Sequence, residues 1–315
     1  MKARHEEEEK KKVMEALARF DIRYRKYTRE AIKIATSYFS SSAKIGVSMT
    51  NDVFNETKKP VKAARLKVIE VLSCMRHPNM VLLVGACPEY GCLVYKYMEN
   101  DSLEDRLFHR NNTPAISWRT RFKIAFEIAI ALNFFHQTKP KPLVHSDLKP
   151  ANIFLDRNYM SKISDVGLAR LVPPFVADGV TQYHMIAVAG SFCYIDLEYQ
   201  QIGMLGTKFD IYSLSVILLQ ILTAKPNIGL TYHMERAIQK GTFSEMLDPT
   251  VNDWPVEEAL SFAKLALQCC ELRRKDRPDL GLVILSELNR IRDLGSDNKD
   301  TGGIIYGESP PNSGF

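Results

Sequence analysis

Four side chains that can exchange protons or stabilise charge stand at fixed offsets in "LVHSDLKPANIFLD", residues 143–156, directly before an apolar run. They are His145, Asp147, Lys149 and Asn152. Taken alone, an Asp or Asn is typical of a turn or a cap. As a set at this spacing, the four residues favour a functional site on a turn after a short strand. Asp165 follows Asn152 by thirteen residues and opens the triplet Asp-Val-Gly.

The pattern H-x-D-L-K-x-x-N followed by D-x-G resembles the catalytic loop and metal-binding turn of the eukaryotic protein-kinase family. The segment "GSFCYIDLEY" (190–199) is similar to the end of a kinase activation segment. Asp210 opens a large apolar helix, as in the family, and "RRKDRPDL" supplies Arg277, which the resemblance pairs with Glu198. The resemblance implies an α+β, bilobal protein-kinase-like fold.

The resemblance also assigns roles in phosphate transfer, a reaction that needs positioning and charge neutralisation more than covalent help. It implies that Asp147 orients a Ser or Thr hydroxyl and accepts its proton, and that Lys149 neutralises charge near the γ-phosphate. Asn152 and Asp165 are expected to hold Mg²⁺. The expected cofactors are ATP and Mg²⁺, and the expected partner is a protein substrate or a partner kinase.

Two longer stretches resemble plant receptor-like cytoplasmic kinases, especially the group that can carry a U-box ubiquitin-ligase module. They are "LSCMRHPNMVLLVGACPEYGCLVYKYMENDSLEDRLF" (72–108) and "SKISDVGLARLVPP" (161–174). Valine in the D-x-G turn is ordinary for this group, so Val166 casts no doubt on the predicted metal site.

The glycine-rich nucleotide clamp is degenerate. Against G-x-G-x-x-G-x-V, residues 46–53 read "GVSMTNDV", and only Gly46 keeps a glycine. Glycines there let backbone N–H groups approach phosphates and allow positive φ. Ser48 and Asn51 are small, so the turn is expected to form less tightly. Gly46 and Val53 remain predicted contacts of the nucleotide.

The phosphate-anchoring lysine of the family also falls on a different residue. An ungapped match to V-A-I-K places Ala64 at its position. Lys62 lies on the same face of a strand, about 6.6 Å away along it, and would replace the lysine only through a bulge or a shifted register. In the same match, Val68 occupies the position of the glutamate that holds the lysine. The regulatory helix is shorter than in the family by about a dozen residues, or about three turns. A truncated small lobe is therefore expected.

The resemblance places an adenine slot between the lobes. Val53 would cover the base and Phe154 would lie beneath it. The hinge from Tyr95 to Met98, including Tyr97, would hydrogen-bond the adenine edge through its backbone. Phe154 is larger than the usual leucine and is expected to crowd the slot.

Three departures from the family lie in the C-terminal lobe. Ser146 replaces the arginine that binds a phosphate on the activation segment. This predicts that phosphorylation of the segment does not switch the activity in the usual way. Leu197 replaces a proline and Ser215 replaces a glycine. None of these changes removes the predicted base or a predicted metal ligand.

Composition and patterning divide the chain into a charged helical segment, a small truncated lobe, a larger helical lobe and a disordered tail. These parts span residues 1–40, 41–98, 99–294 and 295–315. A cleft between the unequal lobes is the expected ligand site. The tail is rich in Gly, Ser, Asn, Asp and Pro, which is typical of disorder.

The small lobe is predicted to hold an antiparallel sheet of about four strands. One hairpin is expected within 44–67, and a second should join "MVLLVGAC" (80–87) to "GCLVYKYM" (91–98). A preceding helix within 27–39 would bring Ile32, Ala35 and Phe39 to one face.

Helical patterning dominates the larger lobe. Ser117 is a predicted N-cap for "SWRTRFKIAFEIAIALNFFHQ", whose apolar residues form a stripe at helical spacing. The further predicted helices span residues 208–223, 256–272 and 279–294.

Composition limits the class of protein. The 315 residues are 45% hydrophobic and 25% charged, as in soluble globular chains. The net charge of +5 is spread along the chain, so no nucleic-acid partner is predicted.

The six cysteines contain no C-x-x-C pair, which favours reduced thiols in a cytoplasmic protein. The longest apolar stretch, residues 211–222, falls short of the roughly 20 residues that a membrane span needs. Oligomeric state stays open.

Three interpretations of function remain open. The chain is a serine/threonine protein kinase whose activity is weak or absent because its nucleotide clamp is compromised. Alternatively, Ala64 and Val68 mark a pseudokinase that works as a scaffold or regulatory binding module. In the third interpretation the sequence is a truncated gene-model product of an active kinase, because the departures cluster in residues 46–69.

Overall fold

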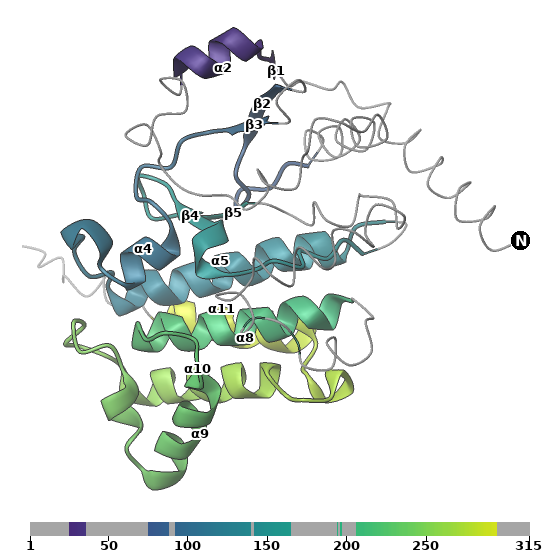
Figure 1. Ribbon diagram of the computed structural model, residues 1–315. Coiled ribbons are helices and arrows are strands. Elements are labelled where there is room, and N and C mark those ends of the chain that lie inside the picture. The colour runs from purple at the N-terminus through teal and green to yellow at the C-terminus, as the bar shows by residue number, and fades with distance from the viewer. Residues whose placement is uncertain are drawn as a thin grey trace, which may run out of the picture.

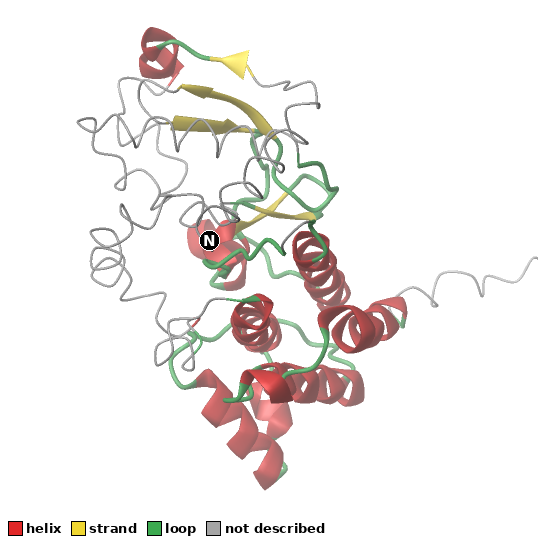
Figure 2. Ribbon diagram, turned by 90° about the vertical axis from the view of Figure 1, so that its right-hand side faces the viewer, coloured by secondary structure: helices red, strands yellow, loops and turns green. Residues whose placement is uncertain are grey.

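The computed structural model describes residues 25–35, 75–87, 92–139, 142–164, 194, 196 and 206–294. Within these ranges, a small sheet with one helix lies above a larger group of helices (Figures 1 and 2). The predicted bilobal α+β fold is confirmed. The predictions for residues 1–24, for the hairpin within 44–67 and for the tail lie outside the described residues.

The small sheet contains three described strands in the order β1-β2-β3. They are β1 (Arg25–Lys26), β2 (Leu83–Cys87) and β3 (Cys92–Tyr95). β2 and β3 are antiparallel, with Leu83 opposite Tyr95, which confirms the predicted second hairpin. β1 pairs with β2 in parallel, so a segment assigned to the charged N-terminal part adds an unpredicted edge strand.

Gly85 explains how β1 and the residue after it approach β2 so closely. A Cβ atom on Gly85 would lie within 3.0 Å of both the Arg25 carbonyl oxygen and the Tyr27 ring, a separation that real Cβ atoms essentially never show. The Tyr27 N–H donates to the Ala86 carbonyl at 2.9 Å. Any side chain at position 85 would therefore push the β1 segment away.

The substitution Gly85→Ala is expected to destabilise this edge by about 1–3 kcal/mol, the usual range for overpacking. Faster hydrogen exchange of the Tyr27 amide should report the loss. Gly206→Ala is the matched control, because a Cβ there meets nothing within 4 Å. Unchanged exchange at Tyr27 in Gly85→Ala would contradict this account of the sheet edge.

Helix α2 (Arg29–Ala35) follows β1. The Ala31 N–H donates to Thr28 Oγ1 at 3.2 Å, which closes the first turn. Ile32 is buried, as predicted, but Ala35 is exposed. Within the described part of the helix, Ile32 is therefore the residue of the predicted face that is buried. Phe39 lies outside the described residues.

The larger lobe is built around α5 (Trp118–His136) and α8 (Thr207–Thr223). Ser117 Oγ accepts from the Thr120 N–H at 3.3 Å, which confirms the predicted N-cap. α8 is buried along nearly its whole length and packs between α5 and α10 (Val256–Cys269). None of the helices in the described ranges is long and apolar enough to cross a membrane.

The last predicted helix begins with a π-helical turn, Leu280–Ile284, and continues as α11 (Leu285–Asp293). Asp279 Oδ1 accepts from the Leu282 N–H at 2.8 Å and caps this start. Two further helices were not predicted: α4 (Leu103–Leu107) and α9 (Leu230–Lys240).

Two adjacent cysteines end α10. Burial raises the pKa of the half-buried Cys270 thiol to about 11 and raises the pKa of the buried Cys269 thiol as well. Both thiols are therefore protonated at neutral pH and poorly nucleophilic.

A buried ion pair joins α5 to the segment before α10. The fully buried Arg121 donates from Nη2 to Asp248, and from Nε and Nη1 to the carbonyls of Ile116 and Ile221, both at 2.9 Å. Its guanidinium thus links three separate stretches of the lobe.

Candidate catalytic loop

Three residues predicted to act in catalysis lie together in the structure. Lys149 Nζ is 3.1 Å and 3.0 Å from the two carboxylate oxygens of Asp147. Asn152 Nδ2 donates to the Asp147 carbonyl at 2.8 Å and to Asp147 Oδ2 at 3.0 Å. The Asp147 side chain is 47% exposed, whereas that of Lys149 is 14% exposed. The carboxylate is thus held in place yet open to a partner from solvent.

Asp210, in the first turn of α8, fixes the backbone of this loop. Its buried carboxylate accepts from the His145 N–H at 2.8 Å and from the Ser146 N–H at 3.0 Å. His136 Nε2, at the end of α5, lies 2.9 Å from the same carboxylate. Ser146 has φ 66°, a left-handed conformation that is uncommon outside glycine. Such a conformation persists where the surroundings hold it, and two adjacent N–H groups on one carboxylate do so.

The substitution Asp210→Asn is expected to lower the free energy of unfolding by about 2–3 kcal/mol, because hydrogen bonds to a charged group are among the stronger ones. Urea unfolding would measure the loss. Asp253→Asn is the control, since Asp253 is 69% exposed and its nearest cation, Arg119, is 3.9 Å away. Equal effects of the two substitutions would show that Asp210 does not fix the loop.

His145 connects the loop to the chain that precedes Asp165. Its ring is fully buried. Nδ1 accepts from the Asp147 N–H at 3.3 Å, and Nε2 lies 2.8 Å from the Ser164 carbonyl oxygen. We assign the proton to Nε2, because a carbonyl can only accept. The imidazole therefore ties Asp147 to Ser164.

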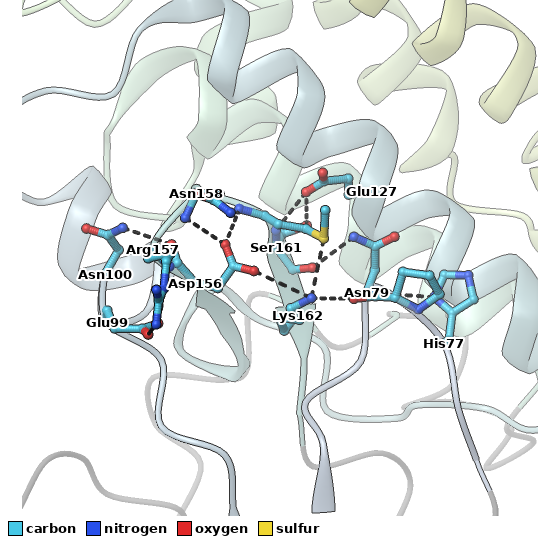
Figure 3. Close-up of polar contacts among 12 residues, drawn as sticks. His77, Asn79, Glu99, Asn100, Glu127, Asp156, Arg157, Asn158, Ser161 and Lys162 are labelled. Atoms are coloured by element: carbon cyan, nitrogen blue, oxygen red, sulfur yellow. Dashed lines mark hydrogen bonds and ion pairs between the residues drawn. The ribbon is translucent and has the colours of Figure 1, made fainter.

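Strands β4 (Ile153–Leu155) and β5 (Ser161–Ile163) form an antiparallel hairpin directly after the loop. Figure 3 shows polar contacts on both edges of the hairpin, near its turn. On the hinge side, Asn100 Nδ2 donates to the Asp156 carbonyl at 2.8 Å. On the other side, Asn79 Nδ2 donates to the Ser161 carbonyl at 3.0 Å. The hairpin is thus fixed between the hinge and residues 77–79.

The turn of the hairpin is also fixed by charge. Burial acts to raise the pKa of Asp156, but hydrogen bonds from the Met160 and Asn158 N–H groups and the nearby Lys162 ammonium outweigh it. The pKa of Asp156 therefore lies below its ordinary value. The carboxylate is ionised at neutral pH and holds the turn closed (Figure 3).

Glu127 supports the hairpin from α5. Its Oε2 accepts from Ser161 N–H at 2.7 Å and from Ser161 Oγ at 2.8 Å. Burial raises the pKa of Glu127, and the bonds from Ser161 and the charge of Lys123 offset that effect only in part. The ionised carboxylate therefore carries an uncompensated cost in the folded state.

This raised pKa predicts a pH dependence of stability. The stabilising contribution of a group whose pKa is raised on folding is fully present below the unfolded-state pKa and is lost as pH rises through the folded-state pKa. The stability of the wild-type chain relative to Glu127→Gln should therefore fall as pH rises above 4.5, the ordinary glutamate value. Urea unfolding of both proteins across this range measures the difference. A difference that is constant with pH would contradict the assignment.

The residues predicted to contact the nucleotide are only partly described. Phe154 is half-buried in β4 and Met98 is buried, whereas the Tyr97 side chain is 55% exposed. The remaining predicted contacts lie outside the described residues: Gly46, Val53, Lys62 and Asp165. The adenine slot and the phosphate clamp therefore stay predictions.

The donor atoms near Asn152 fit the predicted cation. Its side-chain hydrogen bonds to Asp147 both use Nδ2, so Oδ1 accepts no hydrogen bond from the described residues. Ser164, directly before Asp165, donates its N–H to the Asn152 carbonyl at 2.9 Å. An amide oxygen with a following carboxylate is the hard oxygen donor set that Mg²⁺ prefers.

Arg277 pairs with Asp196 in the described part of the chain, and its predicted pairing with Glu198 stays a prediction. It is fully buried, and its Nη1 and Nη2 each lie 2.8 Å from an oxygen of Asp196. Arg274 Nε adds a contact to Asp196 at 3.2 Å. The predicted partner, Glu198, lies outside the described residues. A fork of two parallel N–H groups matches a carboxylate, and Asp196 supplies one to Arg277.

Residues 48–286 match the family described as "Protein kinase domain". Because this match covers more than half of the chain, and because the loop, hairpin and helical lobe are arranged as described above, the chain belongs to the protein kinase domain family. The sequence prediction of that family is confirmed.

The similar proteins narrow this class to a plant group. U-box domain-containing protein 34 of Arabidopsis thaliana is 48% identical over 297 residues, which cover 90% of this chain and 37% of that protein. U-box domain-containing protein 35 of the same plant is 44% identical, covering 96% of this chain and 38% of that protein. U-box domain-containing protein 70 of Oryza sativa subsp. japonica is 34% identical, with coverage of 92% and 38%. This chain thus spans less than two fifths of the length of these relatives.

Proposed function

We propose that this chain transfers the γ-phosphate of ATP to a serine or threonine hydroxyl of a protein substrate, at a low rate. The observation that supports it is the assembled cluster of Asp147, Lys149 and Asn152, with its backbone bound to Asp210. A preassembled group of this kind loses little free energy to rearrangement when substrate arrives.

In the proposed reaction, the oxygen of the substrate hydroxyl bonds to the γ-phosphorus, and Asp147 accepts the proton of that hydroxyl. The bond between that phosphorus and the bridging oxygen breaks, and ADP leaves with its electron pair. Lys149 stays beside Asp147 and neutralises charge on the transferred group. The exposed face of the Asp147 carboxylate is where the hydroxyl would bind.

Magnesium bound by Asn152 Oδ1 and Asp165 would neutralise phosphate charge, which is the chemistry that this ion supplies in the family. Asn152 has a second task that needs no ion, because its Nδ2 orients the Asp147 carboxylate. The orientation of the base is therefore set by the protein alone.

We propose a low rate because of the sequence at the nucleotide clamp. Ala64 and Val68 occupy the positions of the lysine and glutamate that place the phosphates. Preorganised charge of this kind commonly makes the largest single contribution to lowering the reaction barrier, so its loss costs several orders of magnitude in rate. Lys62 is the nearby cation that we propose as a partial substitute.

The same two positions support a second candidate function, a pseudokinase that binds partner proteins without turnover. In that case the cluster of Asp147, Lys149 and Asn152 stabilises the loop and does not catalyse a reaction. Cys269 and Cys270 form no disulfide, which is consistent with a reducing compartment, and we propose the cytoplasm for either function.

Nucleotide binding is tested by thermal unfolding with increasing ATP in the presence of Mg²⁺. A ligand that binds the folded state stabilises it by RT ln(1 + [L]/Kd). We expect a rise in Tm that begins only near about 1 mM ATP, the upper end of common affinities for substrates, and that disappears when EDTA removes Mg²⁺. No rise at any nucleotide concentration would contradict the phosphotransfer proposal.

A further inference from the structure

Helix α9 and its neighbouring loops line a depression of about 680 Å³ that the catalytic proposal does not use. We call it the α9 surface and define it by six residues: Lys225, Ile228, Tyr232, Arg236, Lys240 and Met246. Figure 1 shows α9 at the end of the helical lobe farthest from the sheet, with α8 and α10 between it and β4. The depression is thus remote from β4, the strand that follows the catalytic loop.

The α9 surface follows from the two faces of the helix. Leu230, Met234 and Ala237 are buried and attach α9 to the lobe. Tyr232, Arg236 and Lys240 are spaced four residues apart, which places them in a row on another face. All three are exposed. The row forms one wall of the depression.

The cations on this surface lack carboxylate partners within the described part of the chain. Lys225 Nζ contacts the Glu245 carbonyl oxygen at 3.5 Å and Met246 Sδ at 3.8 Å. Arg236 Nη1 donates to the Tyr232 hydroxyl at 2.7 Å, and its guanidinium lies 5.6 Å from that ring. No Asp or Glu is among the residues that line the depression, and His233 adds a further nitrogen-bearing ring.

Large apolar groups are exposed among these cations. Ile228 is 78% exposed and Tyr232 is 54% exposed. Met246 is half-buried beside Lys225. Adjacent exposed apolar groups that are rimmed by polar residues are a feature of protein-interaction sites.

We propose that the α9 surface binds an acidic segment of a partner protein that carries an apolar residue between its carboxylates. The carboxylates would pair with Lys225, Arg236 and Lys240, and the apolar residue would contact Ile228. Arg236 and Lys240 are one helical turn apart, about 6 Å along the axis, and Lys225 lies on a separate loop. Charges spread in this way suit an extended acidic segment better than a single phosphate group. Binding here does not depend on phosphate transfer.

The test uses fluorescence anisotropy with the full chain and a short labelled peptide of Asp and Glu around a central leucine. Reversing two charges, in Arg236→Glu with Lys240→Glu, is expected to weaken binding by about tenfold or more, because each tenfold corresponds to only about 1.4 kcal/mol. The matched control is Lys264→Glu with Lys275→Glu, which changes the net charge equally at exposed positions outside the depression. The control should bind as the wild type does.

Two further measurements sharpen the result. Ile228→Ser should weaken binding of the leucine peptide but not of its serine analogue, and added salt should weaken binding in general. Circular dichroism and Tm establish that the variants are folded. Equal losses in both charge-reversal pairs, or unchanged binding in Arg236→Glu with Lys240→Glu, would overturn the proposal.

The chain itself contains an acidic run, Glu6–Glu9. If replacing these four glutamates with glutamine makes the peptide bind more tightly, the run competes for the surface. That result would overturn the proposal of a partner protein in favour of an intramolecular ligand. Unchanged affinity in this variant supports the partner.

Discussion

Replacing Asp147 with asparagine is expected to lower the rate of phosphate transfer by about 10²–10⁴-fold, the usual contribution of a general base. An amide cannot accept the proton of the substrate hydroxyl. The replacement has the same shape, and its oxygen can still accept from Lys149 Nζ. The loss should therefore appear in the rate of transfer from labelled ATP and not in folding.

Two controls separate this effect from a structural one. Because the Asp147 side chain is 47% exposed, the Tm of Asp147→Asn should stay close to that of the wild type. Asp253→Asn, at an exposed carboxylate outside the loop, should leave the transfer rate unchanged. A transfer rate in Asp147→Asn equal to that of the wild type would remove Asp147 from the proposed mechanism.

Replacing Arg121 with methionine is expected to lower the free energy of unfolding by about 3–5 kcal/mol, the cost of leaving one partner of a buried ion pair alone. Asp248 is 2% exposed. Burial acts to raise the pKa of Asp248, but the Thr250 N–H and the charge of Arg121 hold that pKa below its ordinary value. Without Arg121, the carboxylate would lose a large part of that compensation. Urea unfolding measures the change.

A double variant separates the lost charge pair from lost packing. Arg121→Met with Asp248→Leu removes both charges, and replacing both partners of a buried pair by apolar groups is often close to neutral. The double variant should therefore be more stable than Arg121→Met alone. Arg119→Met, at a 46% exposed arginine two positions earlier in α5, should cost less than about 1 kcal/mol. If the double variant is no more stable than the single one, the pair does not account for the loss.

The long helices of the larger lobe could be predicted because apolar residues repeat at helical spacing over many turns. Ser117 marked the start of α5, and the structure confirms it. α9 was missed because only Leu230, Met234 and Ala237 of its residues are buried, although Gly229 and Gly241 at its ends were a usable signal. β1 is two residues long and depends on Gly85, far along the chain, so no local pattern reveals it.

The loop residues could be predicted because their spacing is local. The residue that holds them could not, since Asp210 contacts His145 across 65 positions of the chain and no local pattern pairs a lone aspartate with a distant backbone. The contact of Arg277 with Asp196 was not predicted, because Asp196 and Glu198 are both carboxylates of one motif and the resemblance points to Glu198. No sequence pattern identified Ser164 as the residue whose carbonyl contacts His145.

Among the described residues, those of the hairpin and the helical lobe hold the catalytic loop in place. His145 contacts Ser164, the loop backbone contacts α8, and the hairpin contacts α5 through Glu127. The departures from the family cluster in residues 46–69, outside the described residues. We therefore expect the low rate to arise from how the nucleotide is held and not from the orientation of Asp147.

The most direct test of the proposed function is transfer of labelled phosphate from ATP, with excess Mg²⁺, to a protein acceptor rich in serine and threonine, followed by phosphoamino-acid analysis. We predict slow labelling of serine and threonine, above the background of Asp147→Asn, with half-saturation at or above about 1 mM ATP. Labelling no higher than that of Asp147→Asn at the highest ATP concentration would contradict the proposed phosphate transfer and favour the binding module.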